Sequence, residues 1–478
     1  MNDTRFIPLP GRHARAVAWA VLGAAALSGY FANFSVTGWS HDSLSDVISA
    51  VCLRLYGHDE HGVRLPIVAL ESVGDFKAPL FAYLNALAFF FVKPSIYVAR
   101  AISLGFGLAG MAVLVAFARK MTDAATAGWF APPFFAFGLL SSWILAGQNF
   151  PAEPSLAVFC TALAVWFSAT VIDRPQSLKA GLLYGLASGL LPYAYWNTKF
   201  LFVANTALVV LVLALRRGRD LLRPAKAGGL LLGLGLLTCL GLPHLLGALF
   251  NHKTMVRAAS VLETDPLAVA SHFLTHISPV FLFIHIPPRY EYQATYGGAL
   301  NLVFLPFVLI GLWESCRRIL ARSSPVHLYL VLLLPVTFIP TALTRRDVDF
   351  HNMLRTLIAF VPLFLLAFVG AQRTLAWCAG RADARAWLHA LLLVTVLFGG
   401  FEAYKSVDAY TLSLRRCQDL GRTDQLSSIP KDWNDPVRQV ACEDFSYPTT
   451  YYRYYRLVER DDRCYCNHKP DMGGTGGR

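Results

Sequence analysis

Carboxylate side chains gather in one polar stretch, residues 39–79, early in an otherwise apolar chain. They are Asp42, Asp46, Asp59, Glu60, Glu71 and Asp75, and only three basic residues accompany them. An apolar core needs no such groups, because a buried carboxylate is costly unless it is paired. Carboxylates held at fixed positions do serve as general bases in group transfer. The stretch is therefore the first candidate for a reaction centre.

The composition places this candidate centre in a membrane protein. Of the 478 residues, 55% are hydrophobic and 15% are charged, whereas about a quarter of the residues of a soluble protein are charged. Apolar segments recur at about 17–25 residues, the length of a membrane-spanning helix. The net charge of +12 comes largely from Lys and Arg in short loops, which orients the spans and does not indicate nucleic acid as a partner. We expect an all-α integral membrane protein.

Eleven spans follow from the apolar segments when the short basic loops are kept inside. They cover about residues 14–34, 96–118, 124–146, 153–172, 178–195, 198–215, 227–249, 299–315, 326–343, 355–371 and 386–403. Residues 79–92 are short for a crossing, and counting them as one would place Arg119 and Lys120 outside. We therefore predict an interfacial helix there. The N-terminus is then inside, and two long loops, 35–95 and 250–298, are outside.

Two domains follow from this layout. Residues 1–403 form a membrane domain, and residues 404–478 form an extracytoplasmic tail rich in Tyr and Cys. Its four cysteines favour disulfides in an oxidising compartment, in any of three pairings; they are Cys417, Cys442, Cys464 and Cys466. A metal site in the CYCNH segment is the alternative, although its spacing matches no common zinc module. The predicted location is the cytoplasmic (inner) membrane, crossed many times, with the C-terminus outside.

Two helical patterns each allow two interpretations. Gly181, Gly185 and Gly189 recur every four residues, which favours tight helix packing over a close backbone approach to a ligand. His272 and His276 share one helical face and could ligate a metal. No acidic residue follows them in the HExxH manner, so histidines at the membrane interface are the favoured interpretation.

The loop between the spans 326–343 and 355–371 departs from the positive-inside rule. Arg345, Arg346 and Arg355 lie on its outer side. Cations placed there against the usual bias indicate an anionic ligand. Pairing with acidic residues of the same loop, or with lipid headgroups, is an equally good explanation.

The segments around the acidic stretch resemble a known class of enzymes. Asp42 follows the first span, GHDEHGVRLPIVALESVGDFKAPLFAYL comes next, and VARAISLGFGLAG follows with its arginine. This order resembles the polytopic glycosyltransferases of the GT-C class, above all the bacterial relatives of protein O-mannosyltransferases and lipid A aminoarabinose transferases. Weaker similarity extends through YAYWNTK, PVFLFIHI and HNMLR, over about residues 14–405. The DEHG and GDFKAPL segments are the most specific part.

The resemblance implies a function for the whole membrane domain. The donor would be a sugar linked to polyprenyl phosphate and bound from within the membrane. The sugar, a hexose or a pentose, would pass with inversion to an acceptor at the outer face, which is a lipid, a glycan or a protein. The alternative is a lipid or sugar-lipid transporter without glycosyl transfer. A transporter would be expected to carry ionisable residues at mid-membrane and an internal repeat, and the sequence shows neither clearly.

The resemblance also assigns roles to individual residues. Asp42 matches the first acidic residue of the family and is implied as the general base. Ser43 stands where the family has a second acidic residue. Asp46, one helical turn later, is either a substitute for it or an ordinary solvated residue.

Residues implied in substrate binding share positions in the outer loops. The cations among them would face the phosphate leaving group, or would be interfacial residues whose charges reach the headgroups. The set is Asp59, Glu60, Asp75, Lys77, Lys199, Arg289, His351 and Arg355. The sequence assigns no cofactor with certainty, and a divalent cation held by Asp42 and Asp75 is left open.

Overall fold

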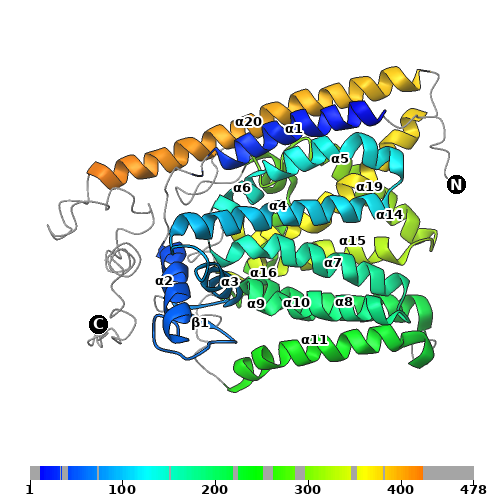
Figure 1. Ribbon diagram of the computed structural model, residues 1–478. Helices are drawn as coiled ribbons and strands as arrows, with labels where there is room; N and C mark the ends of the chain where they lie inside the picture. Colours follow the sequence, from blue (N-terminus) through cyan, green and yellow to red (C-terminus); the bar gives the residue numbers. More distant parts are fainter. Residues whose placement is uncertain are drawn as a thin grey trace.

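The protein is a bundle of long helices that lie side by side (Figure 1). A computed structural model describes residues 11–32, 34, 41–72, 75–149, 152–218, 224–250, 262–285, 297–345, 353–379 and 383–423. Within these ranges the chain is helical except for connections and one two-stranded antiparallel sheet. The expected all-α membrane class is confirmed.

Long helices make up the bundle. They are α1 (Arg12–Phe31), α4 (Ile96–Met121), α5 (Ala124–Leu139), α7 (Ala157–Asp173), α8 (Leu178–Gly189), α10 (Trp196–Arg217), α11 (Pro224–Phe250), α14 (Phe304–Leu320), α15 (Pro325–Val336), α19 (Phe360–Ala379) and α20 (Ala384–Thr423). Shorter elements join them or extend their ends: α6 (Ser142–Asn149), η1 (Glu153–Leu156), α9 (Leu191–Ala194), α13 (Pro266–Ile277), η3 (Val280–Ile284), α16 (Ile339–Ala342), α18 (Met353–Thr356) and η4 (Leu357–Ala359).

Eight helical segments in the described ranges are long and apolar enough to cross a membrane. Each matches one of the predicted spans. The other three predicted spans, 124–146, 178–195 and 299–315, correspond to shorter or interrupted helices, so the number eleven is not confirmed. One cause of interruption is Pro192, which has no N–H to continue α8 and begins the short helix α9 instead. Tyr195 then adopts an extended backbone before α10 starts.

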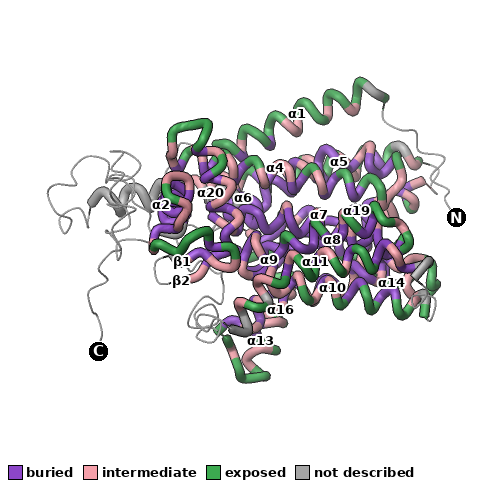
Figure 2. The backbone as a smooth tube through the Cα atoms, turned by 60° about the horizontal axis from the view of Figure 1, so that its bottom comes forward, coloured by how far each residue is buried: buried purple, intermediate pink, exposed green. Residues whose placement is uncertain are grey.

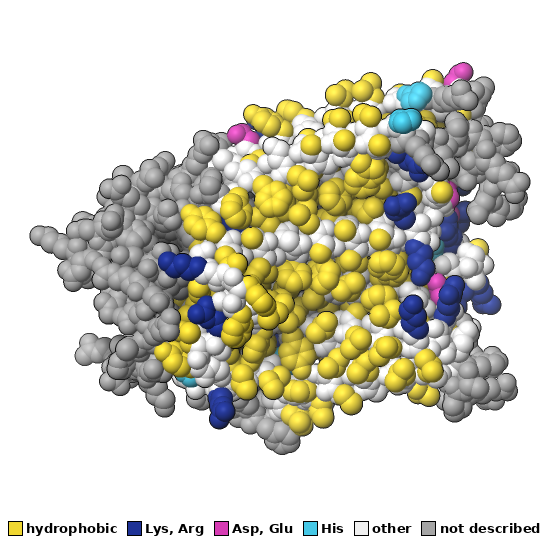
Figure 3. Space-filling model, viewed as in Figure 1, with side chains coloured by type: hydrophobic (Ala, Val, Ile, Leu, Met, Phe, Trp, Pro, Cys, Tyr) yellow, Lys and Arg dark blue, Asp and Glu magenta, His cyan; other side chains and the backbone are white. Residues whose placement is uncertain are grey.

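The surface shows the pattern expected of a membrane protein. Hydrophobic side chains cover the middle of the face seen in Figure 3, and Lys and Arg gather at its two ends. Buried residues concentrate on the inner helices, whereas α1 is exposed along most of its length (Figure 2). The central helix is α19, whose most apolar window is wholly buried. The ring of Phe134 packs edge-on against Phe304 and Phe368, each at 5.0 Å between centroids.

Glycines set the distance between paired helices. A Cβ added to Gly181 of α8 would lie 1.7 Å from the carbonyl oxygen of Gly229 in α11, and one added to Gly185 would lie 2.8 Å from the oxygen of Gly233. One added to Gly189 would lie 2.6 Å from the Leu240 side chain. The helix-packing interpretation of the four-residue glycine pattern is therefore confirmed, because these backbones touch directly.

Three elements close one end of the bundle. They are α2 (His41–Tyr56), a hairpin of β1 (Leu70–Ser72) and β2 (Asp75–Lys77), and α3 (Leu80–Ala88). α2 and α3 stand together beside the ends of α4 and α9 in Figure 1. α3 lies within residues 79–92, where a short helix is predicted, and its place at the membrane interface stays a prediction. The hairpin is an addition that the sequence did not indicate.

The C-terminal side of the predicted boundary also contains a helix. α20 runs without a break from Ala384 past residue 403 to Thr423. The cysteine pattern predicted for the tail falls outside the described residues, except for the backbone of Cys417 in α20.

The glycine contact gives a stability prediction. Gly181→Ala should lower the stability of the folded protein by about 1–3 kcal/mol, because the new methyl group meets the backbone of α11 and the helices must separate. The measurement is the thermal unfolding midpoint of the purified protein in detergent. Gly235→Ala is the matched control, since a Cβ there has nothing within 4 Å. Equal midpoints for the two variants would contradict the close contact.

Candidate functional site

The helix α2 is buried on all sides and still carries polar groups. From Ser43 to Leu53 every residue is buried. Apolar residues such as Leu44 and Ile48 join the main core, while Asp46 on the same helix is only 1% exposed. A carboxylate in such a place is stable only with a partner. The interpretation of Asp46 as an ordinary solvated residue is therefore wrong.

Lys77 supplies that partner from the hairpin. Its Nζ lies 3.6 Å from Oδ1 of Asp46, and the two side chains are 5% and 2% exposed. The antiparallel register pairs Lys77 with Leu70, and Leu70 is itself buried in the core. The strand pairing therefore fixes the position of the Lys77 ammonium group relative to the buried core. Lys77 is not an interfacial residue reaching for headgroups, because its charge points inward.

A third charged residue at this position, Glu153, was given no role from the sequence. It begins η1, and its carboxylate accepts a hydrogen bond from the backbone N–H of Ala78, the residue after Lys77. The charges of Asp46, Lys77 and Lys199 all act on it. The only sequence signal was its place as the one acidic residue in the QNFPAEP turn between two spans. Such a turn gives no indication of what it faces.

Lys199 brings a second cation to the same group. It lies in the first turn of α10, and its Nζ stands 4.8 Å from the centre of the Trp196 ring. Two carboxylates and two ammonium groups from four segments therefore meet at this end of the described bundle. We call Asp46, Lys77, Glu153 and Lys199 the outer charge cluster.

The DEHG segment is anchored to α2. Oδ1 of Asp59 accepts hydrogen bonds from the N–H groups of His61 and Val63, at 2.9 and 2.8 Å. The Ser45 hydroxyl of α2 donates to Glu60. Burial raises the pKa of Asp59, and the bonds from the Val63 and His61 amides oppose that rise. Asp59 therefore shapes the loop from within, and Glu60 ties the loop to the helix that carries Asp46.

Arg355 joins a neighbouring polar contact. It is 8% exposed, and its Nη1 donates to Oγ1 of Thr344 at 3.0 Å. The side-chain amide of Asn197 donates to the Arg355 carbonyl oxygen. Asn197 and Lys199 belong to the same first turn of α10. The HNMLR and YAYWNTK segments, 158 residues apart at this contact, therefore meet beside the outer charge cluster.

The structure leaves some predicted site residues undescribed. The backbone of Asp42 lies in the first turn of α2, one turn before Asp46, and that of Asp75 pairs with Ser72 in the hairpin. Their side chains lie outside the described part, as do Arg289 and His351 altogether. The divalent cation suggested for Asp42 and Asp75 is therefore not tested.

Metal binding finds no support among the described side chains. Within those ranges no group of three or more His, Cys, Asp or Glu residues could hold a metal ion. Nδ1 of His276 lies 2.7 Å from the carbonyl oxygen of His272 inside α13, and its ring packs edge-on against Phe281 at 4.9 Å. These contacts tie His276 to its own segment. We assign no step to a metal ion.

Comparison with solved structures bears on the fold. No protein-family profile and no curated protein sequence matches this chain. The chain is similar to the archaeal oligosaccharyltransferase AglB from Archaeoglobus fulgidus, in complex with an inhibitory peptide and a dolichol-phosphate, with a TM-score of 0.56 and 14% identity. The match covers 93% of this chain and 63% of that one. The chain has the GT-C fold.

Two other solved structures are similar to this chain. Another crystal structure of the Archaeoglobus fulgidus oligosaccharyltransferase, with zinc and sulfate, has a TM-score of 0.50 at 12% identity, over 92% of this chain and 61% of that one. ArnT from Cupriavidus metallidurans, bound to undecaprenyl phosphate, has a TM-score of 0.48 at 14% identity, over 93% and 88%. The fold expected from the sequence resemblance is confirmed.

The ion pair of Asp46 and Lys77 predicts a non-additive effect on stability. Asp46→Asn and Lys77→Met should each destabilise the protein by about 3–5 kcal/mol, because each removes one member of a buried ion pair and leaves the charges of the cluster unbalanced. The double variant removes both charges and should cost less than the sum of the two single effects. Thermal unfolding of the four proteins in detergent measures the difference. Strictly additive losses would show that the two groups do not stabilise one another.

Proposed function

We propose that this protein transfers a sugar from a polyprenyl-phosphate-linked donor to an acceptor hydroxyl at the outer face of the membrane. The observation that carries the proposal is the outer charge cluster, which gathers the buried Lys77 and the half-buried Lys199 at one end of a GT-C bundle. A polyprenyl phosphate has an apolar tail suited to the membrane and an anionic head suited to that end. The AglB structure, which holds a dolichol-phosphate, supports this class of lipid.

The cations of the outer charge cluster suit a phosphate leaving group. The acceptor oxygen bonds to the anomeric carbon while the bond from that carbon to the phosphate oxygen breaks. The electron pair stays on the phosphate, so negative charge grows there as the bond lengthens. Lys77 and Lys199 are held by the fold before reaction, and fixed cations stabilise developing charge without reorganising at the moment of reaction. Arg355, which lies beside the outer charge cluster, is the third cation that we assign to the phosphate.

Asp42 is the general base in this scheme, and Asp46 positions Lys77. A base must accept the proton of the acceptor hydroxyl, and a carboxylate already paired with a buried ammonium group accepts a proton less readily. Asp46 is paired in this way at 3.6 Å. Asp42 precedes it by one helical turn, so the two residues share a face of α2. Attack opposite the departing phosphate inverts the configuration at the anomeric carbon.

The orientation of the molecule is part of the proposal. Cys52 of α2 is disulfide-bonded, and disulfides persist in oxidising compartments. This supports a site on the outer side of the cytoplasmic membrane, with the N-terminus inside and the C-terminus outside. The donor sugar is a hexose or a pentose, and the acceptor carries a hydroxyl on a lipid, a glycan or a protein.

Removal of the proposed base tests the chemistry. Asp42→Asn should lower the rate of sugar transfer by about 10²–10⁴-fold, the usual contribution of a general base, while the protein still inserts and unfolds at the wild-type temperature. The rate is measured as release of polyprenyl phosphate by membranes supplied with polyprenyl-phosphate sugars and lysate acceptors. Glu71→Gln in the hairpin is the matched control and should keep its activity.

The comparison of two aspartates decides between base and positioning residue. Asp46→Asn should weaken both donor binding and stability, because Lys77 loses its partner. Asp42→Asn should leave donor binding unchanged. Full activity in Asp42→Asn, together with loss of turnover but not of binding in Asp46→Asn, would transfer the base role to Asp46.

A further inference from the structure

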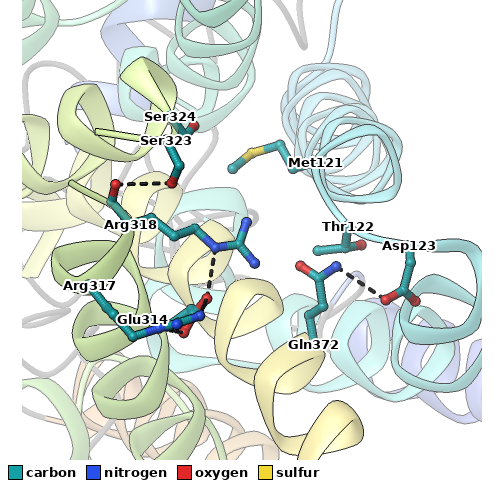
Figure 4. A pocket seen from close by; sticks show the side chains of 9 residues that line it. All are labelled: Met121, Thr122, Asp123, Glu314, Arg317, Arg318, Ser323, Ser324 and Gln372. Carbon is teal, nitrogen blue, oxygen red and sulfur yellow. Dashed lines mark hydrogen bonds and ion pairs between the residues drawn. The ribbon is translucent and has the colours of Figure 1, made fainter. Parts of the chain in front are cut away.

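A polar pocket lies at the end of the bundle opposite the outer charge cluster. Its volume is about 590 Å³, within the range of small-molecule sites. It opens where α4 ends, α5 begins, and the C-terminal parts of α14 and α19 come together (Figure 4). The residues that line it are Met121, Thr122, Asp123, Glu314, Arg317, Arg318, Ser323, Ser324 and Gln372.

A buried carboxylate holds the cations of this pocket in place. Glu314 is 2% exposed, and it accepts hydrogen bonds from Nε of Arg317 and Nε of Arg318, each at 2.8 Å. Nη1 of Arg318 lies 3.3 Å from Nε2 of His327. These contacts fix the Arg318 side chain from one side. In Figure 4 its guanidinium group faces the open space between Met121 and Gln372.

The facing wall offers a hydrogen-bond acceptor. Nε2 of Gln372 donates to Oδ2 of Asp123 at 3.1 Å. A carboxylate only accepts, so this bond sets the orientation of the amide. The amide oxygen, Oε1, is then the end turned toward Arg318 in Figure 4. It is buried and has no hydrogen-bond partner among the described residues, so it is free to accept from water or from a ligand that enters the pocket.

The residues around the pocket are of the kinds found at the level of lipid headgroups. The membrane-spanning segment of α4 ends at Met121, which lines the pocket. Trp313 and Trp377 on the adjacent helices are both 56% exposed, and tryptophan is enriched at the boundary between the hydrocarbon core and the headgroups. The guanidinium of Arg373 stacks over the Trp313 ring at 5.7 Å. A lipid that enters the pocket from the surrounding bilayer would therefore place its headgroup in the pocket.

We propose that this pocket binds a phosphate ester whose headgroup also carries a hydroxyl or an ammonium donor. Arg318 pairs with the phosphate, and Oε1 of Gln372 accepts from the donor. A phospholipid headgroup has both groups, and so does a soluble ester such as glycerol phosphate. The alternative explanation is that these arginines only orient the protein in the membrane. Orientation requires positive charge alone, so it does not account for the buried carboxylate of Glu314 or for the buried acceptor opposite Arg318.

Native mass spectrometry of the full chain in detergent tests the proposal. Phosphatidylglycerol carries both groups, and phosphatidylcholine lacks the donor. The wild-type protein should retain one phosphatidylglycerol in preference to phosphatidylcholine. Arg318→Gln should reduce that retention by about tenfold, the effect of losing one charge-assisted contact. Lys120→Gln, which removes an exposed cation of α4 that does not line the pocket, should leave retention unchanged.

A second variant and a soluble competitor complete the test. Gln372→Leu leaves Glu314 and both arginines intact and should abolish the preference for phosphatidylglycerol, even if Arg318→Gln does not fold. Displacement of the lipid by equimolar glycerol phosphate identifies a soluble ester as the ligand, and no displacement identifies the lipid. Equal retention of the two lipids by the wild-type protein would overturn the proposal. So would equal losses in Arg318→Gln and Lys120→Gln, or an unchanged preference in Gln372→Leu.

Discussion

The contact between Asp46 and Lys77 is the constraint on which the candidate site depends. Both groups are almost completely removed from solvent, so the loss of either one would leave the other without its buried ion pair. The pairing requires that α2 be buried on every side, that the hairpin keep its register, and that Ala78 remain bonded to Glu153. A shift in any of these elements would separate opposite charges in a medium of low dielectric constant. The ion pair therefore holds α2, the hairpin and Glu153 in fixed positions relative to one another.

The rest of the bundle keeps that end in shape. Helices α8 and α11 touch through glycine backbones, as do α14 and α19, where a Cβ on Gly370 would lie 1.8 Å from the carbonyl oxygen of Phe307. Contacts this close leave little freedom for sliding, since any separation would open a gap in a packed interior. The two ends of the bundle then carry different polar groups. The outer charge cluster lies at one end, and the pocket that contains Arg318 lies at the other.

The sequence predicted the bundle well because apolar length and basic loops report directly on membrane crossing. It also selected Asp46, because it lies one helical turn after Asp42, and Lys77, because it lies in the GDFKAPL segment. It could not show that the two residues pair, since they are 31 positions apart and joined by a hairpin with no alternating pattern. Glu153 was missed for the same reason. The residues that surround it in the structure are distant in the sequence, and a single acidic residue in a turn does not indicate them. The roles of Asp42 and Asp75 remain predictions.

The central claim is that this protein performs glycosyl transfer and does not merely move a lipid. The most direct measurement reconstitutes it in vesicles with a panel of polyprenyl-phosphate sugars and an acceptor extract, and follows free polyprenyl phosphate by mass spectrometry. The account predicts that one donor is consumed and that free polyprenyl phosphate appears in step with glycosylated acceptor. Movement of an intact polyprenyl-phosphate sugar across the vesicle, with no release of polyprenyl phosphate from any donor, would contradict it.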